Sequence, residues 1–187
     1  MTDTVDATLA ALAILAQVAA AGIVVAMVAA LVSERVRRGL VGSWGALSRQ
    51  SIWIAWFVAA VATGGSLYLS EIADYPPCQY CWYQRIAMYP LAVVLLAGGL
   101  LRDRRAALYA FVFPVVGACI SIYHIYIEVN PDKESAACRA GVPCATRWID
   151  EFGYVTIPVM ALSAFVLIGL LLAVSFIAGR RADAPTA

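Results

Sequence analysis

Five long apolar stretches alternate with short polar segments along the 187-residue chain. Each stretch is long enough for an α-helix that crosses a hydrocarbon layer of about 30 Å. The expected helices cover approximately residues 7–32, 51–69, 81–101, 106–127 and 154–178. The pattern therefore predicts an all-α integral membrane protein.

The polar segments between these stretches are short, apart from the one over residues 128–151. The first two stretches are separated by an arginine cluster and a Gly- and Ser-containing segment, which we interpret as a linker. The first stretch is preceded by Asp3 and Asp6 and has no basic start. We therefore expect it to be a membrane helix and not a cleaved signal peptide.

The composition agrees with a chain whose main partner is the lipid bilayer. Hydrophobic residues make up 63% of the sequence and charged residues only 13%, whereas soluble domains average about 25% charged residues. The formal net charge is +1 and no run of basic residues is long enough to suggest a nucleic-acid surface. We expect no nucleic-acid partner.

The basic residues are distributed unequally between the two ends of the expected helices. Nine of the thirteen fall at one end: Arg35, Arg37, Arg38, Arg49, Arg102, Arg104, Arg105, Arg180 and Arg181. The other four fall at the opposite end: Arg85, Lys133, Arg139 and Arg147. Because cytoplasmic loops are enriched in Lys and Arg, we expect an inner-membrane protein with the N-terminus outside and the C-terminus cytoplasmic.

Four of the five cysteines fall in loops or at a helix end on the expected outer side, where disulfides persist. They are Cys78, Cys81, Cys138 and Cys144. Cys119 falls in the middle of an apolar stretch, where a small packing residue is the simplest interpretation. The sequence therefore suggests two cysteine pairs and one unpaired cysteine.

Cys78 and Cys81 follow Pro76 and Pro77 and precede a long apolar stretch. Prolines suit a helix start, so we expect the cysteines in the opening turn, where backbone N–H groups favour a thiolate. At about 100° per residue, Arg85 falls on the face that carries both sulfurs. This arrangement favours a redox site, although a static disulfide, half of a zinc site or a snorkelling arginine would use the same residues.

The stretch Cys78-x-x-Cys-Trp-Tyr-Gln-Arg-Ile-x-Met-Tyr-Pro-Leu91 resembles the DsbB/BdbC family of disulfide bond formation proteins, which are quinone-coupled membrane thiol oxidants. Cys138-x5-Cys144, followed by Trp-Ile-Asp and Phe-Gly-Tyr-Val-Thr-Ile-Pro158, is similar to the second half of the family pattern. The resemblance covers about residues 50–178 and implies a four-helix transmembrane bundle.

The resemblance also implies how the chain is divided. Residues 51–178 would form the redox domain, residues 1–50 an extra N-terminal transmembrane helix with a basic cytoplasmic linker, and residues 179–187 a cytoplasmic tail. The extra helix departs from the family's usual four spans. An anchoring or packing helix is the simplest interpretation of it.

The implied function is a quinone-dependent protein-thiol oxidoreductase. It would reoxidise an extracytoplasmic thioredoxin-like (DsbA-like) protein and pass electrons to ubiquinone or menaquinone. In the implied relay, a partner thiolate attacks Cys138 of a Cys138–Cys144 disulfide, and the released Cys144 attacks Cys78 of a Cys78–Cys81 disulfide. Cys81 is then left as a thiolate beside Arg85 and delivers electrons to the quinone.

Several residues have two open interpretations. Arg85 matches the family's quinone-site arginine, while Trp82, Tyr83 and Tyr89 suit either a quinone-ring wall or an interfacial aromatic belt. The only histidine, His124, suits either proton delivery near the quinone or a structural role. Three further expectations concern the 128–151 loop: a solvated Glu128, an exposed and exchangeable Cys138–Cys144 disulfide, and an amphipathic segment over residues 148–152 at the membrane surface.

Two other classes of protein remain open. A vitamin K epoxide reductase-like enzyme also connects membrane cysteine pairs to quinone, but in that family the loop pair precedes the C-x-x-C motif, and here it follows. A non-enzymatic membrane protein with structural disulfides or a metal site is the second alternative. Bound quinone would favour an enzyme, whereas tightly bound zinc would favour the non-enzymatic class.

Overall fold

The computed structural model describes the backbone of residues 2–103 and 105–182, and side chains within these ranges except those of residues 2, 37–49 and 178–182. The elements in order are α1 (Thr2–Val32), α2 (Glu34–Glu71), α3 (Gln79–Leu101), α4 (Ala106–Ala110), α5 (Val112–Val129), η1 (Pro131–Lys133), α6 (Ala136–Ala140) and α7 (Ile157–Ala182). Within the described ranges, five spans are long and apolar enough to cross a membrane. The predicted all-α membrane architecture is confirmed.

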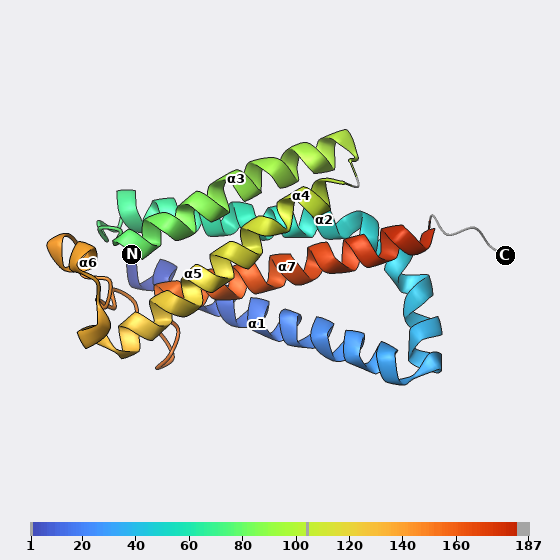
Figure 1. Ribbon diagram of the computed structural model, residues 1–187, viewed down its shortest axis with the longest axis horizontal. Helices are drawn as coiled ribbons and strands as arrows, with labels where there is room; N and C mark the ends of the chain where they lie inside the picture. The colour runs from blue at the N-terminus through green and yellow to red at the C-terminus, as the bar shows by residue number, and fades with distance from the viewer. Residues whose placement is uncertain (1, 104, 183–187) are drawn as a thin grey trace.

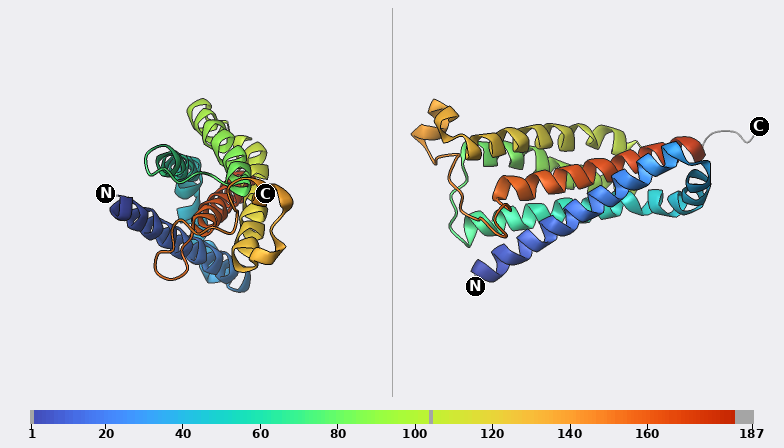
Figure 2. Two further views of the ribbon diagram at one scale, coloured as in Figure 1. Left: turned by 90° about the vertical axis from the view of Figure 1, so that its left-hand side faces the viewer. Right: turned by 90° about the horizontal axis from the view of Figure 1, so that it is seen from below.

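The helices lie side by side along one long axis, with the start of α1 and the end of α7 at opposite ends of the molecule (Figure 1). The start of α1 lies at the same end as η1, α6 and the loop that precedes α3, as the further views also show (Figure 2). Helices α2, α3, α5 and α7 pack on one another, and α1 packs against α7 and α2. The fold is therefore a four-helix bundle with one additional N-terminal helix.

The structure differs from the predicted helices most clearly at two places. The expected linker after the first span is helical, because Ser33 caps a helix that begins at Glu34 and continues into the second span. The fourth span is divided into α4 and α5 at Phe111. Pro114 lacks the N–H group that would bond to the carbonyl of Ala110, which explains the interruption at this point.

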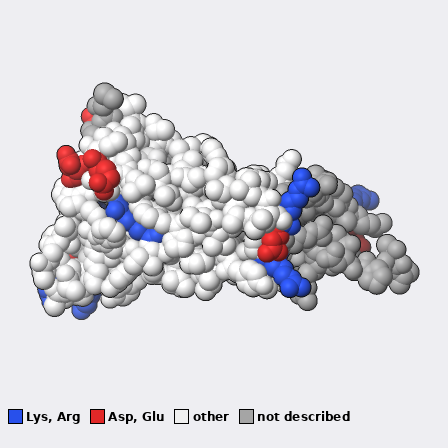
Figure 3. Space-filling view, turned by 90° about the horizontal axis from the view of Figure 1, so that it is seen from above, with Lys and Arg blue, Asp and Glu red and all other residues white. Residues whose placement is uncertain are grey.

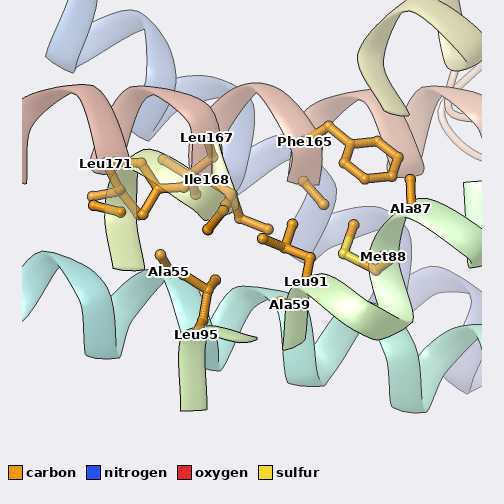
Figure 4. Close-up of a cluster of buried hydrophobic side chains, with 14 of the residues drawn as sticks. Ala55, Ala59, Ala87, Met88, Leu91, Leu95, Phe165, Leu167, Ile168 and Leu171 are labelled. Atoms are coloured by element: carbon orange, nitrogen blue, oxygen red, sulfur yellow. The ribbon is translucent and has the colours of Figure 1, made fainter. Parts of the chain in front are cut away.

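Small residues bring the helices of the bundle close together. Alanines of α2 and α3 meet leucines of α3 and α7 in the main buried cluster, where the labelled side chains converge (Figure 4). A Cβ atom on Gly117 of α5 would lie 2.3 Å from the ring of Phe165 on α7. Such close approach is the usual way in which membrane helices gain van der Waals contact.

Polar contacts and close packing attach α1 to the bundle. Gln17 Nε2 donates to Ser163 Oγ of α7 at 2.9 Å, and the Tyr154 hydroxyl donates to Gln17 Oε1 at 2.9 Å. Near the start of the helix, the Tyr75 hydroxyl donates to Asp6 Oδ2 at 3.0 Å. Helix α1 is therefore held at two levels along its length.

The charged side chains visible in Figure 3 gather toward the two ends of the molecule, and an uncharged surface separates them. This is the surface that a bilayer-spanning bundle requires. The side chains of Arg37, Arg38, Arg49, Arg104, Arg180 and Arg181, and the expected tail beyond residue 182, lie outside the described residues. The protein is a multi-pass membrane protein.

Candidate redox site

The C-x-x-C motif lies at the start of α3, as expected from the two prolines before it. Cys78 is the N-cap residue, with extended backbone angles, and its Sγ accepts a 3.3 Å hydrogen bond from the backbone N–H of Cys81. Capping satisfies one of the free N–H groups of the first turn. The same contact places a partial positive charge beside the Cys78 sulfur.

The two sulfurs of the motif lie 2.9 Å apart without a disulfide bond between them. The pKa of Cys78 is lowered to about 4, chiefly by the hydrogen bond from the Cys81 thiol and further by His124, while burial opposes the shift. Above that pH the reduced pair carries its negative charge on Cys78. In this dithiol state the thiolate is therefore on Cys78.

His124 lies between the two cysteine pairs. Its Nε2 is 3.5 Å from Cys78 Sγ and 3.0 Å from the carbonyl oxygen of Cys144. Because a carbonyl can only accept a hydrogen bond, Nε2 must carry a hydrogen. The same N–H faces the Cys78 sulfur, so His124 stabilises a thiolate at that position.

Cys138 and Cys144 form a disulfide within the loop that follows α5. Each is only 1% exposed, and both pack with Cys78 and Ile127 in one buried cluster. The expectation of an exposed loop disulfide was therefore wrong. The four cysteines are gathered at one end of the bundle, with the outer pair covered by its own loop.

Glu134 holds this loop closed and was not singled out from the sequence. Its Oε1 accepts hydrogen bonds from the backbone N–H groups of Cys144 and, at 3.1 Å, Ala145. The neighbouring Ser135 caps α6 by accepting from the N–H of Cys138 at 3.2 Å. A charged acceptor close to two cysteines in a polar loop is the only sequence signal that could have identified Glu134.

Arg85 lies one turn into α3 from Cys81 and is only 9% exposed. Its Nε donates to the Ser66 hydroxyl at 3.0 Å and its Nη2 donates to the Ser66 carbonyl at 2.9 Å. Its guanidinium carbon lies 5.2 Å from the centre of the Trp82 ring. The side chain is directed into the bundle and does not snorkel to the surface.

A cavity of about 440 Å³ lies between α1, α2, α3 and α7. Cys81, Gln84 and Arg85 line it, together with many apolar side chains. A largely apolar cavity of this size with a few convergent polar groups suits a small organic ligand. A guanidinium carries five N–H donors, more than Ser66 uses, so the remaining donors can bind an acceptor oxygen of such a ligand.

The three aromatic residues considered as a quinone-ring wall differ in their relation to this cavity. Tyr89 lines it, whereas Trp82 and Tyr83 are not among its lining residues and are 53% and 41% exposed. His124 lines a separate small cavity with Cys78, Cys81 and Glu128. The structure thus supports Tyr89 as a wall of the large cavity and places His124 at the cysteine pairs.

Two other expectations about single residues were wrong. Glu128 is buried and accepts a 2.8 Å hydrogen bond from the Thr156 hydroxyl, so it is not solvated. Cys119 is exposed on the outer surface of α5 and does not pack inside the bundle. Trp148, the first residue of the amphipathic segment expected over residues 148–152, stacks on Tyr75 with ring centres 5.6 Å apart.

A family model described as disulfide bond formation protein DsbB matches residues 48–175. The chain belongs to the DsbB family. Helices α3 to α6, α7 as far as residue 175 and the membrane-spanning part of α2 (Gln50–Glu71) lie within the matched segment, while α1 lies outside it. Like other DsbB family members, the chain is a membrane oxidoreductase that forms disulfide bonds.

Individual relatives support the same assignment. Disulfide bond formation protein C of Bacillus subtilis is 44% identical over 119 residues, which cover 63% of this chain and 86% of that protein. The probable disulfide formation protein C of Halalkalibacterium halodurans is 49% identical over 115 residues, which cover 61% and 84%. No solved structure matches the chain.

The positions of the possible ligand atoms bear on the alternative of a metal site. Among the described residues, donor atoms of Cys78, Cys81 and His124 lie within 4.8 Å of one another, and so do those of Glu134, Cys138 and Cys144. These are two sets of three, whereas a structural zinc site uses four ligands. The four-cysteine arrangement considered from the sequence is not formed.

Proposed function

We propose that this DsbB family protein takes electrons from a thioredoxin-like dithiol outside the membrane and passes them to a membrane quinone, ubiquinone or menaquinone. The observation that carries the proposal is the position of the inner cysteine pair. Cys78 packs in the cluster that holds the loop disulfide, while Cys81 lines the large cavity with Arg85. The pair thus lies between a protein-thiol site and a small-molecule site.

The first exchange uses the loop disulfide. A thiolate of the partner attacks Cys138 Sγ, which forms a mixed disulfide, breaks the Cys138–Cys144 bond and leaves Cys144 as a thiolate. A second partner thiol then resolves the mixed disulfide, so that the partner leaves oxidised. Because both loop cysteines are 1% exposed, the loop held by Glu134 has to open for the attack.

The second exchange moves the electron pair to the inner cysteines. The Cys144 thiolate attacks Cys78 of an oxidised Cys78–Cys81 pair, forming a Cys144–Cys78 bond and releasing Cys81 as a thiolate. Cys81 and Arg85 line the same cavity, so this anion forms on the side of the fixed cation. Attack by Cys138 on Cys144 then restores the loop disulfide and leaves the inner pair as the dithiol, with its charge on Cys78.

The large cavity is the proposed quinone site. When bound, a quinone would act as the oxidant by taking up two electrons and two protons. Arg85 would donate a hydrogen bond to a quinone carbonyl, and Gln84, which donates to Ser121 at 3.1 Å, would be held at the cavity wall. Tyr89 and Met88 provide apolar surface for the ring.

We further propose that the cysteine end of the bundle faces the exterior, with the N-terminus outside and the C-terminus in the cytoplasm. The unequal distribution of basic residues supports this orientation, and disulfides persist outside the cytoplasm. Residues 51–178 would act as the redox domain, since they nearly coincide with the family match over residues 48–175.

The direct test is quinone reduction by purified protein, driven by a reduced thioredoxin-like protein. Cys81→Ser removes the sulfur on the cavity side, so we expect no quinone reduction, while the loop disulfide still forms mixed disulfides on non-reducing gels. Cys119→Ala is the matched control, because Cys119 lies on the outer surface of α5, and should be close to full activity. Full turnover by Cys81→Ser would rule out the relay.

A further inference from the structure

Helix α1 supplies one wall of the proposed quinone cavity. Six of its residues line the cavity: Leu9, Leu12, Ala13, Leu15, Ala16 and Ala19. The family match begins at residue 48, so this wall is an addition to the family's matched segment. The extra helix is therefore part of a site and more than an anchor.

The cavity has a polar end and an apolar end. The polar lining residues Cys81, Gln84 and Arg85 come from the first turns of α3, beside Ser66 of α2, and the lining from α3 stops at Tyr89. The lining from α2 continues from Leu69 to Phe57, which is about 18 Å at 1.5 Å per residue. Beyond Tyr89 the cavity is bounded by α1, α2 and α7, and its lining there is apolar: Leu15, Ala19, Phe57, Val58, Val61 and Leu167.

The apolar end opens toward the surface of the bundle between α1 and α2. Leu15 of α1 and Phe57 of α2 both line the cavity, yet they are 64% and 62% exposed. On a membrane-spanning bundle this surface faces lipid. A ligand with a long apolar chain could thus place its polar head near Arg85 while its chain passes outward between the two helices.

The position of α1 is fixed by specific contacts. Asp6 accepts from Tyr75 at the cysteine end, and Gln17 bonds to Ser163 and Tyr154 further along. A Cβ atom added to Gly65 of α2 would lie 2.9 Å from Leu9, so the two helices approach closely there. These contacts hold α1 close to α2 beside the polar end of the cavity.

We propose that α1 and α2 form a channel for the isoprenoid tail of the quinone, with the ring at Arg85 and the tail leaving toward lipid past Leu15 and Phe57. This inference rests on the proposed quinone function and deepens it. It assigns α1 a role in selecting quinones by their tails. The apolar lining, the length of the cavity and its lipid-facing opening all match a prenyl chain.

The test compares two alanines of α1 that differ in their relation to the cavity. Ala19 lines the cavity and Ala21 does not, although both are exposed on the helix. Ala19→Phe narrows the channel, so we expect KM for decylubiquinone to rise about tenfold while KM for a tail-less benzoquinone is unchanged. Ala21→Phe makes the same chemical change on another face and should alter neither KM.

A second measurement locates the tail without turnover. A ubiquinone analogue with a diazirine at the end of a ten-carbon tail, photolysed on the full-length protein, should label peptides from α1 or from residues 57–62. Labelling confined to α3, α5 and α7 would overturn the channel.

The outcomes separate the two proposals. If the unchanged protein reduces quinone but Ala19→Phe and Ala21→Phe behave alike, the channel is wrong and the quinone function stands. The same holds if Ala19→Phe affects tailed and tail-less quinones equally. If the unchanged protein reduces no quinone and the photoprobe labels nothing, both proposals fail together.

Discussion

His124 Nε2 lies 3.5 Å from the sulfur of Cys78, and the same nitrogen lies 3.0 Å from the carbonyl oxygen of Cys144. One imidazole therefore contacts the inner pair and the backbone of the outer pair. Neither contact could be inferred from the sequence, because His124 is 46 residues from Cys78. The relationship gives the histidine a role in controlling the thiolate.

The first prediction concerns the pH at which Cys78 becomes reactive. In a background where Cys119, Cys138 and Cys144 are alanine, iodoacetamide should react with the reduced protein down to about pH 4, because the pKa of Cys78 is lowered to that value. His124→Phe removes a hydrogen bond to the thiolate, so the midpoint should move upward by about one unit. The readout is the alkylation rate as a function of pH.

Tyr123→Phe is the control for this experiment, because Tyr123 is next to His124 in the chain but has no contact with the Cys78 sulfur among the described interactions. An unchanged midpoint in His124→Phe would contradict the role of His124. It would show that the hydrogen bond from Cys81, the larger cause of the lowered pKa, is sufficient to lower the pKa of Cys78.

The second prediction concerns Arg85. Arg85→Met retains an unbranched stem and removes the charge and the donors, so a hydrogen bond from a charged group, worth about 1.5–3 kcal/mol, would be lost. We expect KM for quinone to rise roughly 10- to 100-fold, while mixed-disulfide formation at Cys138 is retained. Arg139→Met, at an exposed position of α6, is the matched control. Equal kinetics for the two variants would exclude Arg85 from the quinone site.

The third prediction concerns Glu134. Its carboxylate accepts from the N–H groups of Cys144 and Ala145, so Glu134→Ala should release both and raise their amide hydrogen exchange by about tenfold or more, as expected for about 1.5 kcal/mol of local stability. Glu134→Gln keeps an acceptor oxygen, so its exchange rates at these two amides should lie between those of the unchanged protein and Glu134→Ala. Unchanged exchange in Glu134→Ala would mean that other contacts keep the loop closed.

The fourth prediction concerns the attachment of α1. Tyr75→Phe removes the hydrogen bond to Asp6 and retains the stacking on Trp148, so unfolding in detergent should become easier by about 1 kcal/mol. The pKa of Tyr75 is raised chiefly by that hydrogen bond, so the bond is present below pH 10 and is lost only above it. Tyr109→Phe, at a 60% exposed position, should not change stability at all.

The fifth prediction concerns orientation. Asp132→Cys lies at the cysteine end, where the side chain of Asp132 is 71% exposed, and Arg102→Cys lies at the exposed end of α3. In a Cys119→Ala background, an impermeant maleimide should label the first variant in intact cells and the second only after lysis. The reverse pattern would invert the proposed topology. Cys138 and Cys144 themselves are too buried to serve as reporters.

The membrane spans were predictable because apolar length alone determines them. The position of Cys78 at a helix start was predictable for an equally local reason, since Pro76 and Pro77 precede it and suit a helix entry. The helical continuation from Glu34 was not, because glycine and serine only weaken a helix in place of ending it.

The different surroundings of Cys78 and Cys81 could not be predicted from the sequence, because they depend on the tertiary structure. A helical projection placed Cys78, Cys81 and Arg85 on one face, but Cys78 is the N-cap and has non-helical angles. Cys78 therefore lies with the loop cysteines, while Cys81 and Arg85 line the cavity. Burial of the loop disulfide was equally unpredictable, because it depends on packing against Ile127 and Cys78 and leaves no local periodicity.

The burial of Cys138 and Cys144, each 1% exposed, determines which thiols can reduce the loop disulfide. In the proposed orientation, free low-molecular-weight thiols outside the membrane cannot reach a covered disulfide, whereas a protein that binds the loop and opens it can. In the proposed relay, only a protein that opens the loop is then oxidised by the disulfide. In the proposed relay, the closed loop therefore keeps electrons from small thiols out of the membrane quinone pool.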